Sequence, residues 1–475
     1  MKITKLALKD YRGCSDLEIE PAPGLTLIVA MNGVGKTTLI AGLAAALGGL
    51  ACGTFGRPKE EILGRLVRES DHRRIWPSGS DDPLLPQQTA RTLIITSTAK
   101  AFDIEFSWKV RSERIIGDRL AANSVQLAWD PPAALLRERL QAVSGLPEPL
   151  PVLAAVPAYR APPVDHSKFE IPPLGALESV SPERLLSWTA NPLLSVRWQR
   201  IRDRWYEVEQ RSRLEGNRAR NTLTTIVEAL RRALELEDEP RFNADYADFM
   251  VKLRDGGWRP VSYMSDGWRT YIGTVVAVAM RCAELNPWHP DAAHITPGVL
   301  LVDEIEQHLH PRLQLTIIDG LRRAFPELQI IATTHSPLVI TDIKTDDMDR
   351  VLRLERGPDD TLRVESLHSP AGCDAVDILT GAWFGLASTL DDETLKLMAQ
   401  HRALMRKDPA ERDKRKALEE VLRRRIHRYA ETSVEEFVLS VVAELETEPA
   451  FEALSHTQMR ELRNQVLDRI KAGLP

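Results

Sequence analysis

The sequence has few cysteines and no long apolar run. Its four cysteines, Cys14, Cys52, Cys282 and Cys373, lie far apart and form no CxxC pair. This spacing indicates neither a zinc site nor a disulfide framework, and it fits a reducing compartment. The first residues lack the apolar stretch of a signal peptide. No segment reaches the roughly 18 apolar residues that a membrane span needs, so we expect a cytoplasmic protein without a membrane part.

Neither sign of charge dominates the chain. The 475 residues carry a formal net charge of −6, with 27% charged and 43% hydrophobic residues. These are ordinary values for a globular protein. The surface as a whole is therefore not expected to attract nucleic acid, although basic patches can still form locally. The length allows two or three folding units, each with a full core.

A glycine-rich loop joins a predicted buried strand to a predicted apolar helix. The segment Ala30-Met-Asn-Gly-Val-Gly-Lys-Thr37 matches G-x-x-x-x-G-K-[ST] at every fixed position except the first. Such a loop curls its backbone N–H groups round phosphates, and the helix N-terminus adds its positive dipole end. Alanine at the first position is tolerable if its φ stays negative. The expected phosphate-binding residues are Asn32, Gly33, Val34, Gly35, Lys36, Thr37 and Thr38.

Individual residues of this loop have predicted roles. Lys36 is expected to reach the β- and γ-phosphates of ATP, and the Thr37 hydroxyl to bind Mg²⁺.

Asp303 and Glu304 follow a predicted strand at 299–302, which would deliver both carboxylates beside the loop in a parallel sheet. Asp303 would hold Mg²⁺ through water, and Glu304 would orient or deprotonate the attacking water. A helix N-cap is the simpler interpretation of this acidic pair.

A histidine and a serine–glycine pair complete the set of motifs. His335 follows a predicted strand at 329–333 and is well placed to contact a γ-phosphate, although a lone histidine is more often structural. The segment Met264-Ser-Asp-Gly-Trp-Arg269 precedes a predicted apolar helix. It resembles the signature of ABC-type ATPases, [LM]-S-x-G-x-[RQ]. The resemblance implies that Ser265 and Gly267 contact the γ-phosphate bound to the opposite subunit. Neither residue has an evident role within one subunit, so we expect the ATP site to be complete only when two subunits meet.

The motif spacing resembles the SMC, RecF and OLD group of ATPases more than the transporter ATPases. Lys36 precedes Ser265 by 229 residues, whereas Ser265 precedes Asp303 by only 38. A long insertion therefore splits the head. The opening segment around Arg12 also resembles that group, which implies that Arg12 lies near the nucleotide. The Q-loop glutamine has only Gln87 and Gln88 as candidates.

Together these motifs predict an α/β fold, a split ABC-type P-loop ATPase head. We expect its N-terminal lobe at 1–163 and its C-terminal lobe at 249–368, with a helical insertion at 164–248 between them. A helical C-terminal region at 369–475 is expected to bind a partner. The residues from Val434 to Leu445 form a helical apolar stripe within it.

Two further expectations concern the C-terminal lobe. Residues 313–325 are expected to form one helix. The short runs 351–354 and 362–364 are expected to be edge strands.

The tail segment from Asp377 to Leu395 resembles the segment that follows the ATPase head in the PtuA family of Septu and retron antiphage systems. Those ATPases act with PtuB, a separate HNH endonuclease. The resemblance implies an antiphage ATPase that binds ATP and Mg²⁺, forms a homodimer or higher homo-oligomer, and regulates an HNH endonuclease. Nucleic acid, and a retron reverse transcriptase with its DNA, are further candidate partners. An amphipathic tail packed on the head is the plain alternative for this segment.

Two other functions stay open. His401–Arg428 carries 11 Lys or Arg against five acidic residues, and Arg197–Arg220 carries eight Arg against four. Both segments could bind nucleic-acid phosphates, although a charged helix more often has a solvated face with i,i+4 pairs. A RecF-like DNA-repair ATPase and an ATP-sensing scaffold with little hydrolysis are therefore the alternatives. The chain shows no TOPRIM, HNH or Asp/Glu-x-Lys pattern, so we expect no nuclease site in it.

Overall fold

The computed structural model describes two compact units, Met1–Gly385 and Leu386–Pro475. All structural statements below concern the described residues alone. These are 1–31, 33–53, 67, 71–75, 88–90, 92–113, 122–126, 149–158, 194, 196–214, 217–253, 256–341, 343, 348–357, 361–405 and 412–425.

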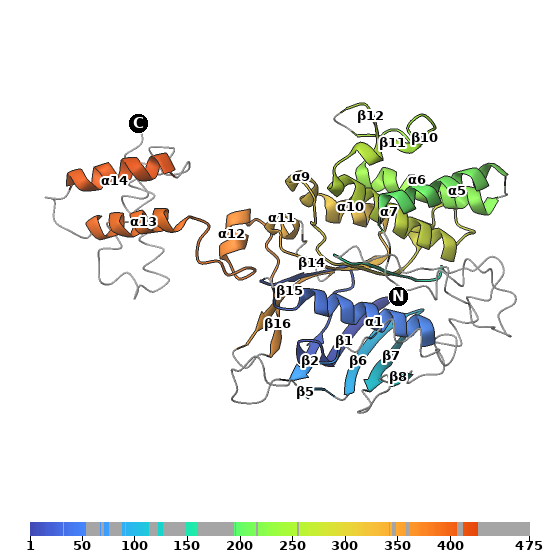
Figure 1. The fold of residues 1–475 in the computed structure, drawn as a ribbon, viewed down its shortest axis with the longest axis horizontal. Coiled ribbons are helices and arrows are strands. Elements are labelled where there is room, and N and C mark those ends of the chain that lie inside the picture. Colours follow the sequence, from blue (N-terminus) through green and yellow to red (C-terminus); the bar gives the residue numbers. More distant parts are fainter. Residues whose placement is uncertain are drawn as a thin grey trace. The chain divides into compact units, whose positions relative to one another are not determined.

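A six-stranded sheet forms the centre of the first unit (Figure 1). Its order is β16-β15-β3-β14-β13-β9, and all neighbours are parallel except β16, which runs antiparallel to β15. Every residue of β3, β9, β13 and β14 is buried, as expected for parallel strands covered on both faces. The strands are β3 (Leu25–Val29), β9 (Val152–Val156), β13 (Gly298–Val302), β14 (Leu328–Thr334), β15 (Asp349–Arg356) and β16 (Leu362–Leu367).

The strand order sets the position of the motifs. Because β14 lies between β3 and β13, the carboxyl ends of all three strands meet at one edge of the sheet. In open parallel sheets this is the edge where ligands bind. The prediction that β15 is an edge strand is wrong, because β15 pairs with β3 on one side and β16 on the other. Its residues Val351, Leu352 and Leu354 are buried accordingly.

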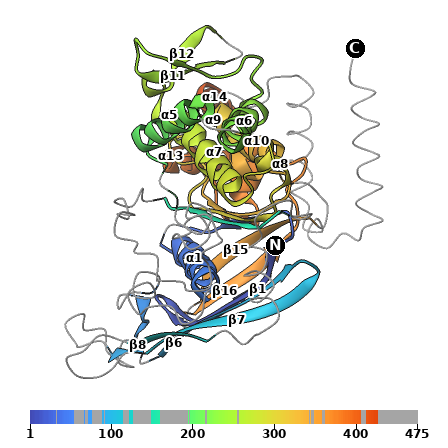
Figure 2. The ribbon, with the colours of Figure 1, turned by 90° about the vertical axis from the view of Figure 1, so that its right-hand side faces the viewer.

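Helix α1 (Lys36–Gly53) lies between the central sheet and a second, antiparallel sheet (Figures 1 and 2). Most of its side chains are apolar and buried, which is typical of a helix covered on all sides. The second sheet has the order β2-β1-β6-β7-β8, and buried residues alternate along β6, so only one face packs inward. Its strands are β1 (Lys2–Tyr11), β2 (Cys14–Ile19), β6 (Thr92–Ala101), β7 (Ile104–Glu113) and β8 (Ala122–Gln126).

Helices cover the other face of the central sheet (Figure 1). Helix α6 packs against α5, α7 and α10, and α7 also contacts β9. The single helix expected at 313–325 is two helices, because Thr316 has a non-helical φ of −124° and caps the second of them. The helices are α5 (Trp198–Leu214), α6 (Asn217–Leu234), α7 (Asp266–Leu285), α8 (Ala292–Ile295), α9 (Pro311–Gln314) and α10 (Ile317–Ala324).

Several small elements complete the first unit. A three-stranded sheet of β10 (Arg241–Asn243), β11 (Asp248–Lys252) and β12 (Trp258–Pro260) precedes a single 3₁₀ turn, Val261–Tyr263, that leads into α7. The short helices α11 (Pro337–Ile340) and α12 (Ala375–Thr380) and the strand pair β4 (Arg74–Ile75) and β5 (Gln88–Thr89) also belong to this unit.

The described part of the second unit is a helix pair. Helices α13 (Asp392–Met405) and α14 (Arg412–Arg425) pack on each other, with buried His401 3.2 Å from Glu419. The expected stripe from 434 to 445 lies outside the described residues, as do residues 164–193. The predicted division into four segments therefore stays a prediction. Among the helices that the structure describes, none is both long and apolar enough to span a membrane.

Candidate nucleotide site

The phosphate loop connects β3 to α1 and has the backbone that its sequence predicts. Gly33 and Gly35 have φ values of +79° and +130°, which glycine adopts at little cost. Ala30 is buried and is not among the residues with positive φ, so alanine fits the place of the first glycine. The first turn of α1 contains no acidic residue, which leaves its positive end free for an anion. The candidate Asn32 lies outside the described residues.

Lys36 folds back over this loop. Its Nζ donates a hydrogen bond to the Ala30 carbonyl oxygen at 2.7 Å and lies 3.3 Å from Nδ1 of His335. Burial lowers the pKa of Lys36 to about 8, although the carboxylates of Glu306, Glu304 and Asp303 oppose that shift. The lysine therefore lies where the ends of β3 and β14 meet, and negative phosphates would stabilise its charged form.

Thr333 ties the ends of β13 and β14 together. Its hydroxyl donates to Oδ1 of Asp303 at 2.6 Å and accepts from the backbone N–H of Glu304 at 2.8 Å. Asp303 is only 4% exposed, and Glu304 has a left-handed φ of 50°. Such strained backbone often occurs at functional sites. The N-cap interpretation of the acidic pair is wrong, because the next described helix is α9, whose N-cap is His310.

A small cavity of about 30 Å³ lies beside the two carboxylates. This volume is enough to hold a water molecule. Thr270 and Thr274 of α7 and Gln307 line it together with Asp303 and Glu304. The structure therefore leaves room for water against the residue predicted to act on water.

His335 follows β14, and its backbone is held by a third carboxylate. Its backbone N–H donates to Oε1 of Glu306 at 2.6 Å, whereas Oε2 of Glu306 is buried and has no hydrogen-bond partner among the described residues. Burial and the nearby Lys36 charge lower the pKa of His335. A neutral imidazole can accept the Lys36 hydrogen bond at Nδ1. Sequence analysis missed Glu306, although an acidic residue so soon after Asp303 and Glu304 was a signal.

Gln314 fixes the remainder of the loop that follows β14. Its Oε1 accepts from the Ser336 hydroxyl at 2.7 Å, and its Nε2 donates to the Leu309 carbonyl oxygen at 2.9 Å. Ser336 also caps α11 by accepting from the backbone N–H of Leu338. Side-chain hydrogen bonds therefore hold the segment after β13 and the segment after β14 together.

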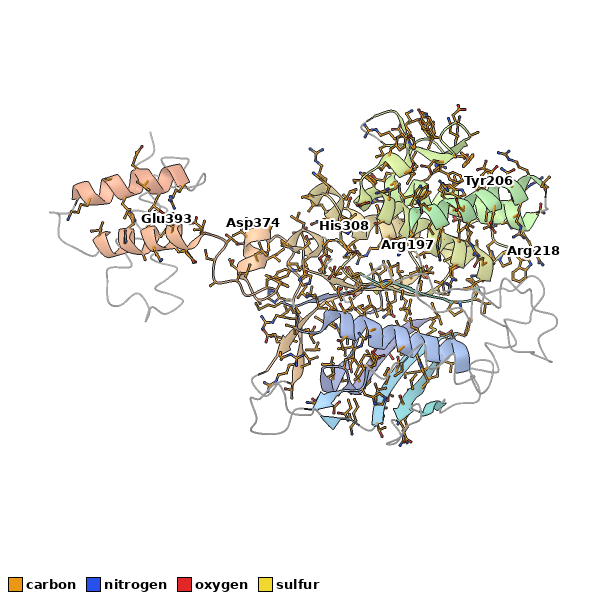
Figure 3. All side chains as sticks on the ribbon, viewed as in Figure 1. Arg197, Tyr206, Arg218, His308, Asp374 and Glu393 are labelled. Carbon is orange, nitrogen blue, oxygen red and sulfur yellow. The ribbon has the colours of Figure 1, made fainter. Side chains whose placement is uncertain are left out.

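The two signature residues differ in their surroundings. Ser265 is the exposed N-cap of α7, and its side chain makes no capping hydrogen bond. Gly267 is buried, and a Cβ there would lie 2.3 Å from the backbone oxygen of His308. His308 belongs to the loop between β13 and α9 (Figure 3). This corrects our expectation for Gly267, which does have a role within one subunit, since it lets α7 approach that loop.

Arg12 lies in a turn anchored by Asp71. Its Nε donates to Oδ1 of Asp71 at 2.8 Å, and its backbone has a left-handed φ of 49°. The adjacent Gly13 lies against the guanidinium of Arg356, whose Nη2 is 3.5 Å from the Val34 carbonyl oxygen. Arg356 therefore links this turn to the phosphate loop, and no sequence motif signalled it. Of the Q-loop candidates, Gln88 lies in β5 and Gln87 lies outside the described residues.

The donor set of the site suits a magnesium nucleotide. Mg²⁺ prefers oxygen ligands such as hydroxyl and carboxylate groups, which Thr37 and Asp303 provide. Lys36 supplies the positive charge for a phosphate chain. The side chains of Thr37, at the start of α1, and Asp303, after β13, belong to elements whose ends share one edge of the sheet. The arrangement can therefore bind phosphates and hold a carboxylate, Glu304, next to them.

Two family models match the chain. Residues 157–341 match the model described as AAA domain, putative AbiEii toxin, Type IV TA system, and residues 5–108 match one described as AAA domain. The second contains the phosphate loop, and the first contains Ser265, Asp303, Glu304 and His335.

Parts of the chain are also similar to three curated proteins. It is 32% identical over 169 residues to Septu protein PtuA of Bacillus mycoides strain KBAB4, which covers 36% of this chain and 22% of that protein. It is 35% identical over 106 residues to the retron Vc95 probable ATPase of Vibrio cholerae, covering 22% and 20%. It is 33% identical over 94 residues to DNA replication and repair protein RecF of Arthrobacter sp. strain FB24, covering 20% and 18%. The matches thus span about a fifth of each relative.

Fold, motif order and relatives agree on the class of protein. The chain has an α/β head and is similar, over parts of its length, to ABC-type ATPases of the RecF-like group. Within that class it is related to PtuA of Septu systems and to retron ATPases.

Proposed function

We propose that this chain binds ATP and Mg²⁺, hydrolyses ATP between two copies of itself, and serves as the ATPase subunit of an antiphage defence system. One observation carries the catalytic part. The carboxyl ends of three adjacent strands bring together a phosphate-binding loop, two carboxylates and a histidine, with Lys36 3.3 Å from His335 and Asp303 tied to Glu304 through Thr333.

Each residue has a defined task in the proposed reaction. Lys36 and the backbone of the phosphate loop would bind the phosphates. Thr37 and Asp303 would hold Mg²⁺, which would neutralise phosphate charge. Glu304 orients water and accepts its proton as it attacks. His335 contacts the γ-phosphate when Lys36 turns to the phosphates. These roles depend on positioning and charge, which is how most phosphoryl transfer is catalysed.

The surfaces around the phosphate loop and around Ser265 support a dimer. Ser265 presents an exposed hydroxyl at the N-terminus of α7, where an anion from another subunit would meet the helix dipole. Met31 in the phosphate loop is 68% exposed, and Tyr263 before the signature is 77% exposed. Both side chains would have less apolar surface exposed to water if another subunit covered them. A second copy would cover both.

Regulation of an HNH endonuclease is the finer part of the proposal. It is supported by the relation to PtuA. Three leucines of the second unit, Leu386, Leu390 and Leu395, are also exposed and accessible to a partner. Nucleic acid and, in a retron setting, a reverse transcriptase with its DNA are further proposed partners. Co-purification of the chain with an HNH protein encoded beside it would test this part.

The second candidate function is a RecF-like ATPase that acts directly on DNA, and the RecF match favours it. Several arginines of the basic segment around α5 are already paired with acids, namely Arg202 with Asp203, Arg204 with Glu284 and Arg213 with Glu209. This pairing reduces their availability for phosphates. Tight duplex binding that weakens steeply with salt would favour the RecF-like function.

Phosphate release by the purified chain, measured with ATP and Mg²⁺, tests the enzymatic proposal. We expect hydrolysis in the wild type. Glu304→Gln should keep ATP binding and nearly abolish turnover, whereas Lys36→Ala should weaken both. Normal turnover by Glu304→Gln would refute the assignment of Glu304, and no turnover by the wild type would favour an ATP-sensing scaffold.

A further inference from the structure

Three sets of hydrogen bonds join the end of β13 and the segment after it to the end of β14 and the segment after that strand. Thr333 bonds to Asp303 and to the backbone of Glu304, and Gln314 bonds to Leu309 and Ser336. Between these two joints, Glu306 receives the backbone N–H of His335 at 2.6 Å. Glu306 is therefore the joint nearest to the imidazole that contacts Lys36.

The carboxylate of Glu306 is costly to bury in this position. Its Oε2 is shielded from water and has no hydrogen-bond partner among the described residues. A buried acceptor without a partner normally loses its hydration without compensation. Its charge is compensated in part by Lys36, because Glu306 is the strongest of the three carboxylates that favour the protonated lysine. A group of this kind is expected to have a function beyond packing.

We propose that Glu306 is a positioning residue for ATP turnover. It fixes the backbone of His335, so that the imidazole stays against Lys36 and moves together with the loop that carries Asp303 and Glu304. Glu306 itself does not touch the reacting atoms in this role. This inference rests on ATP hydrolysis at the site, but the hydrogen bond on which it depends can be tested without any turnover.

The hydrogen bond from the His335 N–H to Glu306 predicts different effects for two Glu306 variants. Glu306→Gln keeps an oxygen that can accept from His335 N–H, whereas Glu306→Ala removes the acceptor. Residues that orient a functional group typically change activity by about tenfold to a hundredfold when they are removed. We expect Glu306→Ala to lower kcat by that factor with ATP affinity changed less than about threefold, and Glu306→Gln to retain most of kcat.

Two measurements test the proposal in the full chain. The first is a double-mutant cycle on kcat with Glu306→Ala, His335→Ala and the pair, because residues that act as one unit are not additive. The second is amide hydrogen exchange of the segment around His335 in the nucleotide-free protein, which Glu306→Ala should speed by about tenfold or more. Glu306→Gln should leave that exchange nearly unchanged. Glu105→Ala, in an exposed position on β7, is the control for removal of an acid.

The outcomes separate this inference from the proposed function. A pair that loses no more kcat than His335→Ala alone supports the positioning role, whereas additive losses overturn it. If the wild type hydrolyses no ATP, the proposed function fails and hydrogen exchange alone decides. Unchanged exchange at His335 in Glu306→Ala, with the variant folded like the wild type by circular dichroism, overturns the inference in either case.

Discussion

Gly267 approaches His308 so closely that no side chain fits between them. A Cβ at position 267 would lie 2.3 Å from the His308 backbone oxygen. Through this approach the signature helix α7 contacts the loop that also carries Glu304 and Glu306. Within one subunit this contact thus links Ser265, which we propose contacts the nucleotide of a partner subunit, with the loop that we propose acts on the subunit's own nucleotide. Such a physical link can carry coupling between two sites.

Gly267→Ala is predicted to disturb this approach. Overpacking of a close contact costs about 1–3 kcal/mol, because backbone rather than a flexible side chain must move. We expect a lower midpoint in thermal unfolding together with reduced ATP turnover. Gly257→Ala is the control, since no atom lies within 4 Å of a Cβ there and its φ is not in the left-handed region. Equal stability of the two variants would contradict the inferred contact.

Thr333→Val is predicted to damage the site although the two side chains have similar shapes. The change leaves Oδ1 of the buried Asp303 and the N–H of Glu304 without the Thr333 hydroxyl. Loss of one partner of a buried hydrogen bond costs about 1–3 kcal/mol. We expect a lower free energy of unfolding in urea. We also expect weaker Mg²⁺ binding, so that half-maximal turnover needs a higher Mg²⁺ concentration. Thr98→Val, at an exposed hydroxyl pair on β6, should change stability by no more than about 0.5 kcal/mol.

ATP binding should weaken at alkaline pH because of Lys36. Its pKa of about 8 in the nucleotide-free protein means that the charged form is lost as the pH rises through that value. Bound phosphates favour the charged form and raise the pKa, so binding at pH 8.5 must take up protons. Affinity should fall by up to about tenfold per pH unit above 8. Calorimetry in buffers of different ionisation enthalpy measures this uptake.

Lys36→Arg is the matched control for the pH effect. Arginine stays charged throughout this range, so the variant should bind ATP without proton uptake even if its affinity differs. Absence of uptake by the wild type at pH 8.5 would show that the Lys36 pKa lies well above 8.

Met31 and Tyr263 are predicted to be buried when two heads meet. Met31→Gln and Tyr263→Ser should each shift Glu304→Gln protein with ATP from dimer towards monomer, because a buried apolar side chain contributes about 1.5–3 kcal/mol. Analytical ultracentrifugation reports this shift. Leu214→Ser removes a side chain that is 88% exposed on α5, and it should leave the dimer intact. A dimer unaffected by both changes would place the interface elsewhere.

The main strands and helices and the positions of the motifs were predictable from the sequence. The apolar runs of β3, β13 and β14 and the glycine pattern before Lys36 are local signals, and each element formed where it was expected. Contacts between loops distant in sequence could not be predicted, because they depend on strand order. Placement of β14 between β3 and β13 brings Glu306 to His335, and no spacing within either segment indicates this.

The interior position of β15 and the break at Thr316 were missed for another reason. A strand with mixed polarity such as β15 has the same sequence pattern at an edge or inside a sheet, because the ladder is made by backbone atoms. Similarly, the apolar pattern of residues 313–325 continues across Thr316, whereas its backbone does not. Arg356 has no local pattern at all, since its place beside Val34 arises only when β15 pairs with β3.

The central claim is that each ATP site takes Lys36 from one subunit and Ser265 from another. Phosphate release by a mixture of Lys36→Ala and Ser265→Ala proteins tests it most directly, because each mixed dimer regains one site with both residues intact. We predict that each variant alone is nearly inactive and that an equal mixture recovers up to about a quarter of wild-type turnover. A mixture no more active than its components, or a fully active Ser265→Ala protein, would contradict the shared site.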